Sequence, residues 1–288
     1  MLIRTLFAAG IAAALALPAQ ANILVTYPDF TNACTGGSLT CVGSATTVGS
    51  VLRLTPNADG QSGAAYSTTP VTLGASNTFS TQFQFQITSP GGIAPADGIT
   101  FVLSAGSGGL GVSGGGIGYQ NVPNSVAIEY DTYPNGSNDA GNSSNHVAID
   151  INGHVADGSG LDDQDPGYPY GVSSCGFGGG RGCLSNGDVW TTTIGYNGSY
   201  LSVSVQDGSN PVDNIINNYA INLSSVLGTS NAFVGFTSAT GEGNENHYIL
   251  NWQFADTTQL GPKVPEPASL ALLGMGFAGV GLIRRRRR

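Results

Sequence analysis

Alternation of apolar and polar residues is the feature that most limits how this chain can fold. Between residues 79 and 87, phenylalanine and isoleucine alternate with serine and glutamine, and the period of two recurs between residues 201 and 205. Helical periodicity is nearly absent between residues 22 and 263. The 44 glycines, with turn pairs such as Asp97–Gly98, Asn152–Gly153 and Asn197–Gly198, indicate many strands joined by tight turns. The sequence therefore predicts an all-β fold, an antiparallel β-sandwich.

The N-terminal end has the pattern of a secretory signal peptide. Residues 1–21 combine a basic start at Arg4, an apolar run from residue 6 to 17 and the triplet Ala19-Gln20-Ala21. The run is short for a transmembrane anchor, which favours cleavage over anchoring. We expect the mature chain to begin at Asn22 and the folded domain to occupy residues 22–258.

The C-terminal end carries a second targeting pattern. Residues 259–267 form a linker that ends in Pro265-Glu266-Pro267, and an apolar run over 268–283 is followed by five arginines at 284–288. We predict a single transmembrane helix in residues 268–288, with the arginines on the cytoplasmic side of the inner membrane. The pattern resembles the bacterial PEP-CTERM sorting signal. That resemblance implies an exosortase-type processing enzyme and export to the envelope or extracellular matrix of a Gram-negative cell that makes exopolysaccharide.

The charge of the predicted domain limits the classes of ligand that it can bind. The predicted domain keeps only two of the nine basic residues, Arg53 and Arg181, and all the acidic residues but Glu266. A surface this acidic repels nucleic acid and favours cations and neutral ligands.

The four cysteines are expected to form disulfides, because these are the default in an oxidising compartment, and three pairings are open. We favour the two short-range pairs, Cys34 with Cys41 and Cys175 with Cys183.

One segment concentrates ligands for metal ions. Carboxylate and amide oxygens suit Ca²⁺, and an added imidazole suits a transition metal such as Mn²⁺. Strand alternation places the first three members on one face, and the rest follow in the next loop and strand. The cluster contains Glu129, Asp131, Tyr133, Asn135, Asp139 and His146. A further acidic group at Asp162, Asp163 and Asp165 lies in a long loop and does not complete an EF-hand pattern, which favours a solvated loop.

Several stretches, taken together, resemble the legume-type (L-type) lectins, over nearly the whole exported region and in that family's order. Residues 96–103 resemble the family's Ala-Asp-Gly strand, and residues 126–135 resemble its metal-binding strand. Further similarity lies in residues 146–152, 190–205, 234–241 and 247–254. The resemblance implies a jelly-roll sandwich of the concanavalin A type and a non-catalytic protein that binds carbohydrate.

The resemblance also implies roles for single residues. Glu129, Asp131, Asp139 and His146 would hold a transition metal. A neighbouring Ca²⁺ would share Asp131 and Asp139 and add the Tyr133 carbonyl and the Asn135 side chain. These metals would brace a cis peptide between Ala96 and Asp97 rather than touch the sugar.

For the sugar site, the resemblance implies hydrogen bonds and one aromatic contact. The carboxylate of Asp97 would accept from two hydroxyls, the Asn135 amide and a backbone N–H of Gly115 or Gly116 would donate, and Tyr133 would stack on the pyranose. Gly241, Glu242 and Gly243 would line the remaining side. Lectin sandwiches often dimerise through a flat back sheet, but no residue here decides whether the chain forms a homo-oligomer.

Two departures from the family pattern leave alternatives open. Asp139 and His146 are more widely spaced than is common, which supports a structural matrix protein that has lost sugar binding. Related sandwich glycosidases carry two glutamates in Glu-x-Asp-x-x-Glu, and Pro134 occupies the second glutamate position here. Pro134 therefore argues against the remaining alternative, a glycoside hydrolase.

Overall fold

The computed structural model describes residues 22–260 except residue 108, residues 137–138 and residues 156–166. The predicted signal peptide, the acidic group at Asp162, Asp163 and Asp165, and the predicted C-terminal helix lie outside the described residues. Within that part of the chain, no helix has the length and apolar character needed to cross a membrane.

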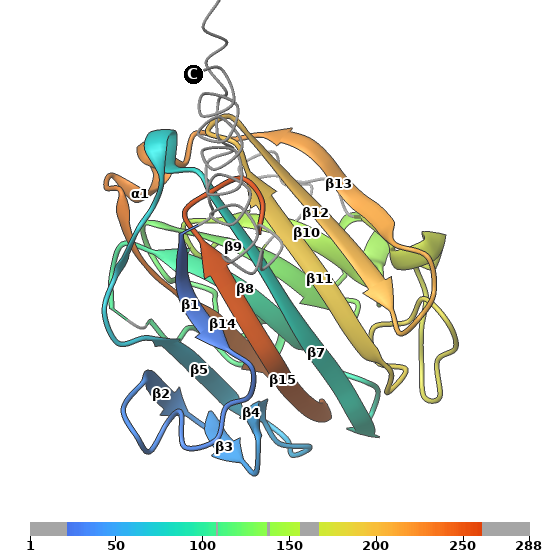
Figure 1. The fold of residues 1–288 in the computed structure, drawn as a ribbon. Helices are drawn as coiled ribbons and strands as arrows, with labels where there is room; N and C mark the ends of the chain where they lie inside the picture. The colour runs from blue at the N-terminus through green and yellow to red at the C-terminus, as the bar shows by residue number, and fades with distance from the viewer. Residues whose placement is uncertain (1–21, 108, 137–138, 156–166, 261–288) are drawn as a thin grey trace, which may run out of the picture.

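Two antiparallel sheets pack face to face, which confirms the predicted β-sandwich (Figure 1). The eight-stranded sheet has the spatial order β13 (Asp213–Ala220), β12 (Tyr200–Asp207), β11 (Val189–Tyr196), β7 (Phe79–Gly92), β15 (Gly243–Ala255), β4 (Val51–Thr55) and β3 (Thr46–Val48), with β1 (Ile23–Tyr27) paired to β15. The seven-stranded sheet has the order β10 (His146–Ile151), β9 (Ser125–Asp131), β8 (Gly98–Ser104), β14 (Asn231–Ala239), β5 (Ser62–Ser67) and β2 (Leu39–Gly43), with β6 (Val71–Thr72) paired to β14.

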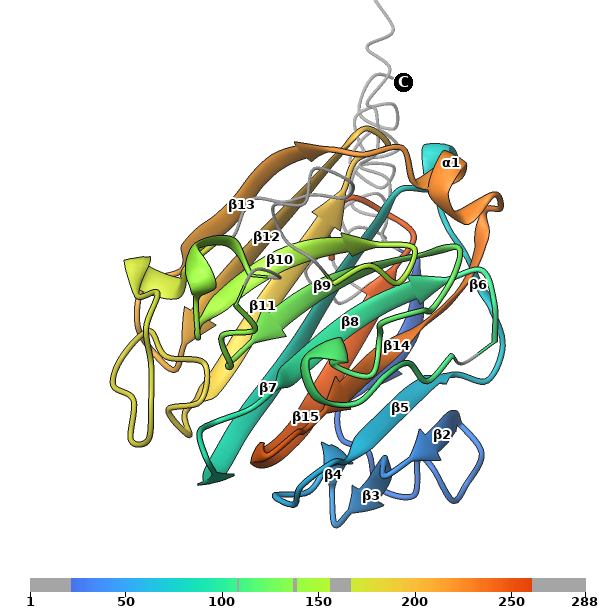
Figure 2. The ribbon, with the colours of Figure 1, turned by 180° about the vertical axis from the view of Figure 1, so that it is seen from behind.

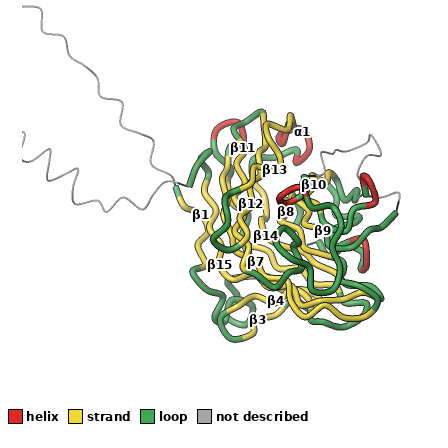
Figure 3. Tube along the Cα trace, turned by 90° about the vertical axis from the view of Figure 1, so that its right-hand side faces the viewer, coloured by secondary structure: helices red, strands yellow, loops and turns green. Residues whose placement is uncertain are grey.

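Helical structure is confined to short pieces in the connections. These are α1 (Leu223–Leu227) and the single 3₁₀ turns η1 (Ala75–Asn77), η2 (Gly114–Gly116), η3 (Ala140–Asn142) and η4 (Pro169–Gly171). The edge-on view in Figure 3 shows the two layers of strands with these turns in the loops around them. The fold class read from the alternation is thus the observed one.

The core fills the space between the two sheets. The apolar residues predicted to share one face of β7, such as Phe83, are fully buried, whereas Gln82 and Gln84 turn outward and donate to Thr193 and Thr191 on β11. Phe236 on β14 connects the two sheets, because its ring packs edge-to-face against the ring of Phe83 on β7. The two ring centroids are 4.9 Å apart. Edge-to-face aromatic pairs contribute about 0.5–1.5 kcal/mol beyond their buried area. This packing holds the two sheets at a fixed separation.

The three predicted turn pairs have different outcomes. Asn197–Gly198 forms the turn between β11 and β12, with the Asn197 N–H donating to the Tyr200 carbonyl at 3.1 Å. Asn152–Gly153 follows β10, with positive φ at both residues. Asp97–Gly98 is not a tight turn, so that expectation was wrong. Gly98 begins β8 with φ of +142°, and a Cβ there would lie 2.2 Å from the Tyr130 carbonyl oxygen, so only glycine fits.

Register in the seven-stranded sheet aligns four strand ends in one row. His146 pairs with Asp131, Asp131 pairs with Gly98, and Gly98 pairs with Ala239. The row crosses β10, β9, β8 and β14, which lie side by side in Figure 2. The loops that follow or precede these strand ends therefore lie close together at one end of the four strands, although residues 97 and 239 are far apart in the chain.

Candidate functional site

Pairing of β9 with β10 builds a buried cluster of potential metal ligands. Asp131 lies opposite His146, and Glu129 is two residues earlier on the same face of β9. The Glu129 Oε1 atom lies 3.2 Å from His146 Nε2. Glu129, Asp131 and His146 are all buried, and each offers a ligand atom within 4.8 Å of the others. The strand alternation that predicted a shared face is thus observed for Glu129 and Asp131.

The charge of this cluster fits a divalent cation. Burial raises the pKa of Asp131 well above its usual range; His146 opposes the rise, and the charges of Glu129 and Asp139 add to it. The buried Glu129 Oε2 atom has no hydrogen-bond partner. Three carboxyl groups beside one imidazole leave an excess of buried negative charge, which is costly without a cation. A nitrogen and several carboxylate oxygens are a suitable donor set for a transition metal such as Mn²⁺.

A second, oxygen-rich group adjoins the first. The Asn135 N–H donates to Asp139 Oδ2, and the Tyr133 N–H donates to Asp131 Oδ1 at 2.6 Å. Asn135 Oδ1 is buried without a hydrogen-bond partner. This carboxylate and amide set has the chemistry of a Ca²⁺ site. Asp139 is not a member of the compact group of three, so its predicted role toward the transition metal stays a prediction.

Residues from four separate segments line one pocket beside these clusters. The pocket has a volume of about 270 Å³, close to the lower end of the range of about 300–1,000 Å³ for ligand pockets. Seven of its lining residues were predicted from the sequence, namely Asp97, Gly115, Tyr133, Asn135, Gly241, Glu242 and Gly243. The lining also includes Ile93, Ala96 and Gly114, which sequence reasoning missed because small and apolar residues carry no chemical signature of their own.

The backbone around Asp97 is held from two neighbouring strands. The Ala96–Asp97 peptide bond is cis, as the family resemblance implied. The Asp97 N–H donates to the Ala239 carbonyl at 3.1 Å, and the Asp97 carbonyl accepts from the Thr132 N–H at 2.9 Å. Asp97 itself is buried apart from its access to the pocket, and its Oδ2 atom has no hydrogen-bond partner. The side chain is thus a polar acceptor presented to the pocket.

Electrostatics make this carboxyl group unusual. Burial raises the pKa of Asp97 to about 7, with further contributions from the charges of Glu245 and Asp139, while the Gly241 N–H opposes the rise. Carboxyl groups with a raised pKa that lie in a pocket are candidates for functional residues. A hydroxyl donor or a nearby cation would satisfy the carboxylate.

The glycine-rich loop lines the pocket with Gly114 and Gly115, whereas the sequence predicted Gly115 or Gly116. Gly115 packs against Asn135, and a Cβ at that position would lie 2.4 Å from the Asn135 Nδ2 atom. Gly116 is buried and is not among the lining residues, because it faces Val112 and Gln120 instead. Gly114 lines the pocket in its place. The many glycines between residues 106 and 118 made this register ambiguous in the sequence.

Both predicted disulfides are present, Cys34–Cys41 and Cys175–Cys183. The second closes a loop that is hydrogen-bonded to the segment just before His146. Ser144 Oγ donates to the Cys175 carbonyl, and Asn145 Nδ2 donates to the Val172 carbonyl. The sequence predicted the covalent pairs but not this contact with the two residues that precede His146.

Comparison with known proteins decides the family. A family profile described as the legume lectin domain matches residues 23–269. The chain belongs to the legume lectin domain family. A second profile, described as the PEP-CTERM protein-sorting motif, matches residues 263–288, so both predicted resemblances are confirmed. A lectin domain joined to this sorting motif supports an exported carbohydrate-binding protein.

Similar proteins of known sequence are plant lectins and lectin-domain receptors. A lectin of Leucomphalos mildbraedii is 29% identical over 209 residues, which cover 68% of this chain and 77% of that protein. The L-type lectin-domain containing receptor kinase I.8 of Arabidopsis thaliana is 29% identical over 243 residues, or 76% of this chain. The matched region spans only 35% of the receptor kinase, so the likeness concerns the lectin part alone.

Solved structures give the same fold. The Lotus tetragonolobus seed lectin superposes with a TM-score of 0.64 at 23% identity, covering 80% of this chain and 96% of that one. The basic winged bean lectin with Tn-antigen superposes with a TM-score of 0.60 at 26% identity, covering 76% of this chain and 92% of that one. The legume lectin sandwich is therefore conserved in this chain at low sequence identity.

Proposed function

We propose that this protein is an exported, non-catalytic lectin whose pocket binds a neutral sugar and whose binding loop is braced by Ca²⁺ and a transition metal such as Mn²⁺. The observation that carries the proposal is the convergence of Asp97, Gly115, Tyr133 and Asn135 on one pocket from three separate segments. That a winged bean lectin of the same fold has been solved with Tn-antigen supports it.

Each of these groups has a role in holding a sugar. The Asp97 carboxylate accepts hydrogen bonds from two neighbouring hydroxyls, and the Asn135 amide donates to a third. The Gly115 backbone N–H donates where a side chain would block the approach. The Tyr133 ring covers an apolar face of the pyranose, and Gly241 and Glu242 close the far wall.

The metals act at a distance from the sugar. Glu129, Asp131 and His146 would hold the transition metal, and Asp131, Tyr133, Asn135 and Asp139 would hold Ca²⁺. When bound, the two cations neutralise the buried carboxylates and fix the loop that carries Tyr133 and Asn135. Pro134 in that loop occupies the place where sandwich glycosidases carry an acid, which supports binding without hydrolysis.

The sorting motif sets where binding takes place. The PEP-CTERM match supports processing by an exosortase-type enzyme and a transient or stable attachment to the inner membrane through residues 268–288. We propose the cell's own exopolysaccharide, or a neighbouring cell's glycans, as the partner. The strongly acidic composition favours a neutral glycan over an anionic one.

Isothermal titration calorimetry of the full-length chain tests this function. The panel contains galactose, N-acetylgalactosamine, glucose, mannose and fucose, each titrated with Ca²⁺ and Mn²⁺ present and again in EDTA. We expect binding of at least one sugar that is lost in EDTA and in Asp97→Ala. Gly176→Ala is a matched control, because a Cβ there contacts nothing within 4 Å. A metal-loaded protein that binds no sugar or polysaccharide would overturn the proposal.

A structural matrix protein on a lectin scaffold is the second candidate. The position of Asp139 outside the compact group of three favours it, because an incomplete metal site would leave the loop unbraced. Retention of the protein in the extracellular matrix distinguishes the two functions. Retention that is unchanged in Asp97→Ala supports the structural role, and retention that is lost supports the lectin.

A further inference from the structure

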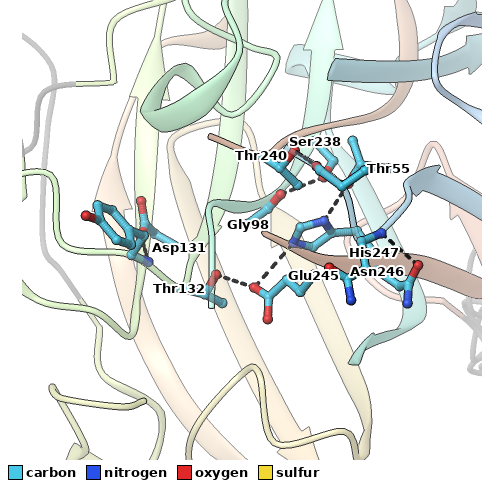
Figure 4. A network of polar contacts seen from close by, with 12 residues as sticks. Thr55, Gly98, Asp131, Thr132, Ser238, Thr240, Glu245, Asn246 and His247 are labelled. Atoms are coloured by element: carbon cyan, nitrogen blue, oxygen red, sulfur yellow. Dashed lines mark hydrogen bonds and ion pairs between the residues drawn. The ribbon is translucent and has the colours of Figure 1, made fainter. Parts of the chain in front are cut away.

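We propose that Glu245 and His247 are positioning residues for the sugar-binding carboxylate of Asp97. They lie in a chain of buried polar contacts, here called the buried relay, formed by Thr132, Glu245, His247, Thr55 and Ser238 (Figure 4). The contact between Glu245 and His247 is an ion-pair contact, and the others are hydrogen bonds. The relay begins at the Asp97 carbonyl and ends at the Gly98 carbonyl. The inference rests on the proposed function, because its consequence is a change in sugar affinity.

One arm of the relay holds the Asp97 carbonyl. The Thr132 N–H donates to that oxygen at 2.9 Å, and the Thr132 hydroxyl donates to Glu245 Oε1 at 2.5 Å. Thr132 follows Asp131 directly, so this arm joins the end of β9 and its metal cluster to β15. Loss of the Glu245 carboxylate would leave the Thr132 hydroxyl without its buried acceptor.

The other arm holds the next carbonyl along the chain. The Ser238 hydroxyl donates to the Gly98 carbonyl at 2.8 Å and lies 3.0 Å from Thr55 Oγ1. Thr55 Oγ1 lies 2.6 Å from His247 Nδ1. His247 Nε2 then lies 3.4 Å from Glu245 Oε1 and closes the relay. Two consecutive peptide carbonyls beside the pocket are thereby tied to one another through β9, β15, β4 and β14.

None of the five relay side chains lines the pocket. All are buried, with at most 2% of their surface exposed. Glu245 and His247 therefore act on a sugar only through the backbone of Asp97 and Gly98. The hydrogen bonds of this network rigidify their surroundings, and removing one member is costly because its partner is left unsatisfied in a buried site. Glu245 Oε2 and His247 Nε2 have no hydrogen-bond partner.

The hydroxyl hydrogens of Ser238 and Thr55 determine which ring nitrogen of His247 carries a proton. Ser238 uses its single hydroxyl hydrogen on the Gly98 carbonyl, so Thr55 must donate to Ser238. Thr55 then has no hydrogen left for His247, and His247 Nδ1 must carry a proton and donate to Thr55. The remaining contact, between His247 Nε2 and Glu245 Oε1, is 3.4 Å long and is not a hydrogen bond, so it leaves the assignment of the Nδ1 proton unchanged.

Glu245 also has an electrostatic effect on Asp97. After burial, the charge of Glu245 is the largest cause of the raised pKa of Asp97. The relay therefore holds the Asp97 backbone and also places the Glu245 carboxylate where its charge acts on the Asp97 side chain.

Two substitutions of Thr55 test the relay with little risk to folding. Thr55→Val keeps the shape of the side chain but removes the hydroxyl that joins His247 to Ser238, and Thr55→Ser restores the hydroxyl. Thr81→Val is the matched control, because Thr81 is also fully buried and also makes two hydrogen bonds, to the Gln253 carbonyl and to Trp252 Nε1, away from the pocket. Sugar affinity, metal affinity and melting temperature are measured for all three full-length variants.

We expect Thr55→Val to weaken binding of the best sugar in the five-member panel at least tenfold, with Ca²⁺ and Mn²⁺ affinities within twofold of wild type. Thr55→Ser should restore the sugar affinity, and Thr81→Val should lower only the melting temperature. Equal sugar affinities in Thr55→Val and Thr81→Val would overturn the relay while leaving the lectin function intact.

Imidazole ¹⁵N spectra give a readout that does not depend on sugar. With His247→Asn used to assign the signals, the His247 ring of the wild-type protein should carry a proton on Nδ1. A ring protonated on Nε2 alone would contradict the proton assignment. If the wild-type protein binds no sugar, the proposed function fails, and this spectrum still decides whether the relay exists.

Discussion

Asn145 donates a hydrogen bond from its Nδ2 atom to the Gly182 carbonyl at 2.8 Å, which ties the loop closed by Cys175–Cys183 to the residue preceding His146. The Leu184 N–H returns a bond to Asn145 Oδ1 at 2.8 Å. Asn145 is fully buried, so these bonds are shielded from water. The disulfide loop is thus hydrogen-bonded to the residue that directly precedes His146.

Removal of this disulfide should weaken transition-metal binding. Each buried hydrogen bond contributes about 0.5–1.5 kcal/mol, and the open loop of Cys175→Ser/Cys183→Ser would hold Asn145 less firmly. We expect Mn²⁺ affinity, measured by calorimetry, to fall about tenfold, which corresponds to about 1.4 kcal/mol.

The other disulfide provides the control for that experiment. Cys34→Ser/Cys41→Ser opens a loop of similar length, with a sequence separation of 7 against 8, and it does not contact the metal cluster. Its Mn²⁺ affinity should match that of the wild type. Equal losses in both double variants would mean that the effect is a general loss of stability.

Substitution of Gly115 should reduce sugar affinity. In Gly115→Ala, the new methyl group would lie 2.4 Å from the Asn135 Nδ2 atom and must displace that amide from the pocket. Loss of one donor costs about 1–3 kcal/mol, so we expect a decrease of at least about fivefold in calorimetric sugar affinity. Gly176→Ala, which meets nothing within 4 Å, should bind like the wild type. Unchanged binding by Gly115→Ala would remove this loop from the sugar site.

The Asp97 carboxyl should titrate near neutral pH in the metal-free protein. Its pKa is raised from 3.8 to about 7, so between these values the native state binds more protons than the unfolded state. Its contribution to stability is therefore present in full below pH 3.8 and is lost as the pH rises through 7. Carboxyl ¹³C spectra, with Asp97→Asn for assignment, measure the titration, and Ca²⁺ should lower the pKa by attraction. A carboxyl that titrates near 3.8 without metal would contradict the inferred burial.

Ligand substitutions should separate the two metal sites. His146→Ala removes the only imidazole of the cluster, and we expect Mn²⁺ affinity to fall by at least about tenfold with little effect on Ca²⁺. Asn135→Ala removes an oxygen ligand from the proposed Ca²⁺ site and should lower mainly the Ca²⁺ affinity. Competition titrations with a fluorescent chelator measure both affinities. Identical losses of both ions in both variants would indicate one site in place of two.

Much of the site was predictable because it depends on local chemistry. The period of two placed Glu129 and Asp131 on one face of a strand, and the observed strand β9 carries them there. The short separations within the cysteine pairs favoured the disulfides that form. The pattern around Asp97 pointed to the family, and seven predicted residues line the pocket. Local periodicity, loop length and residue chemistry determine these features directly.

Other features depend on which strands become neighbours, and only the tertiary structure decides them. Gly98 looked like part of a turn, yet close approach of the Tyr130 carbonyl makes it the start of β8. Glu245 and Thr132 are far apart in sequence and carry no motif that pairs them, but the sheet arrangement buries them in one hydrogen bond. Register across β10, β9, β8 and β14 brings His146 and Asp97 to the same edge. The sequence by itself determined the fold class and the ligand chemistry, whereas long-range strand pairing decided how that chemistry is positioned, because register depends on packing between distant segments.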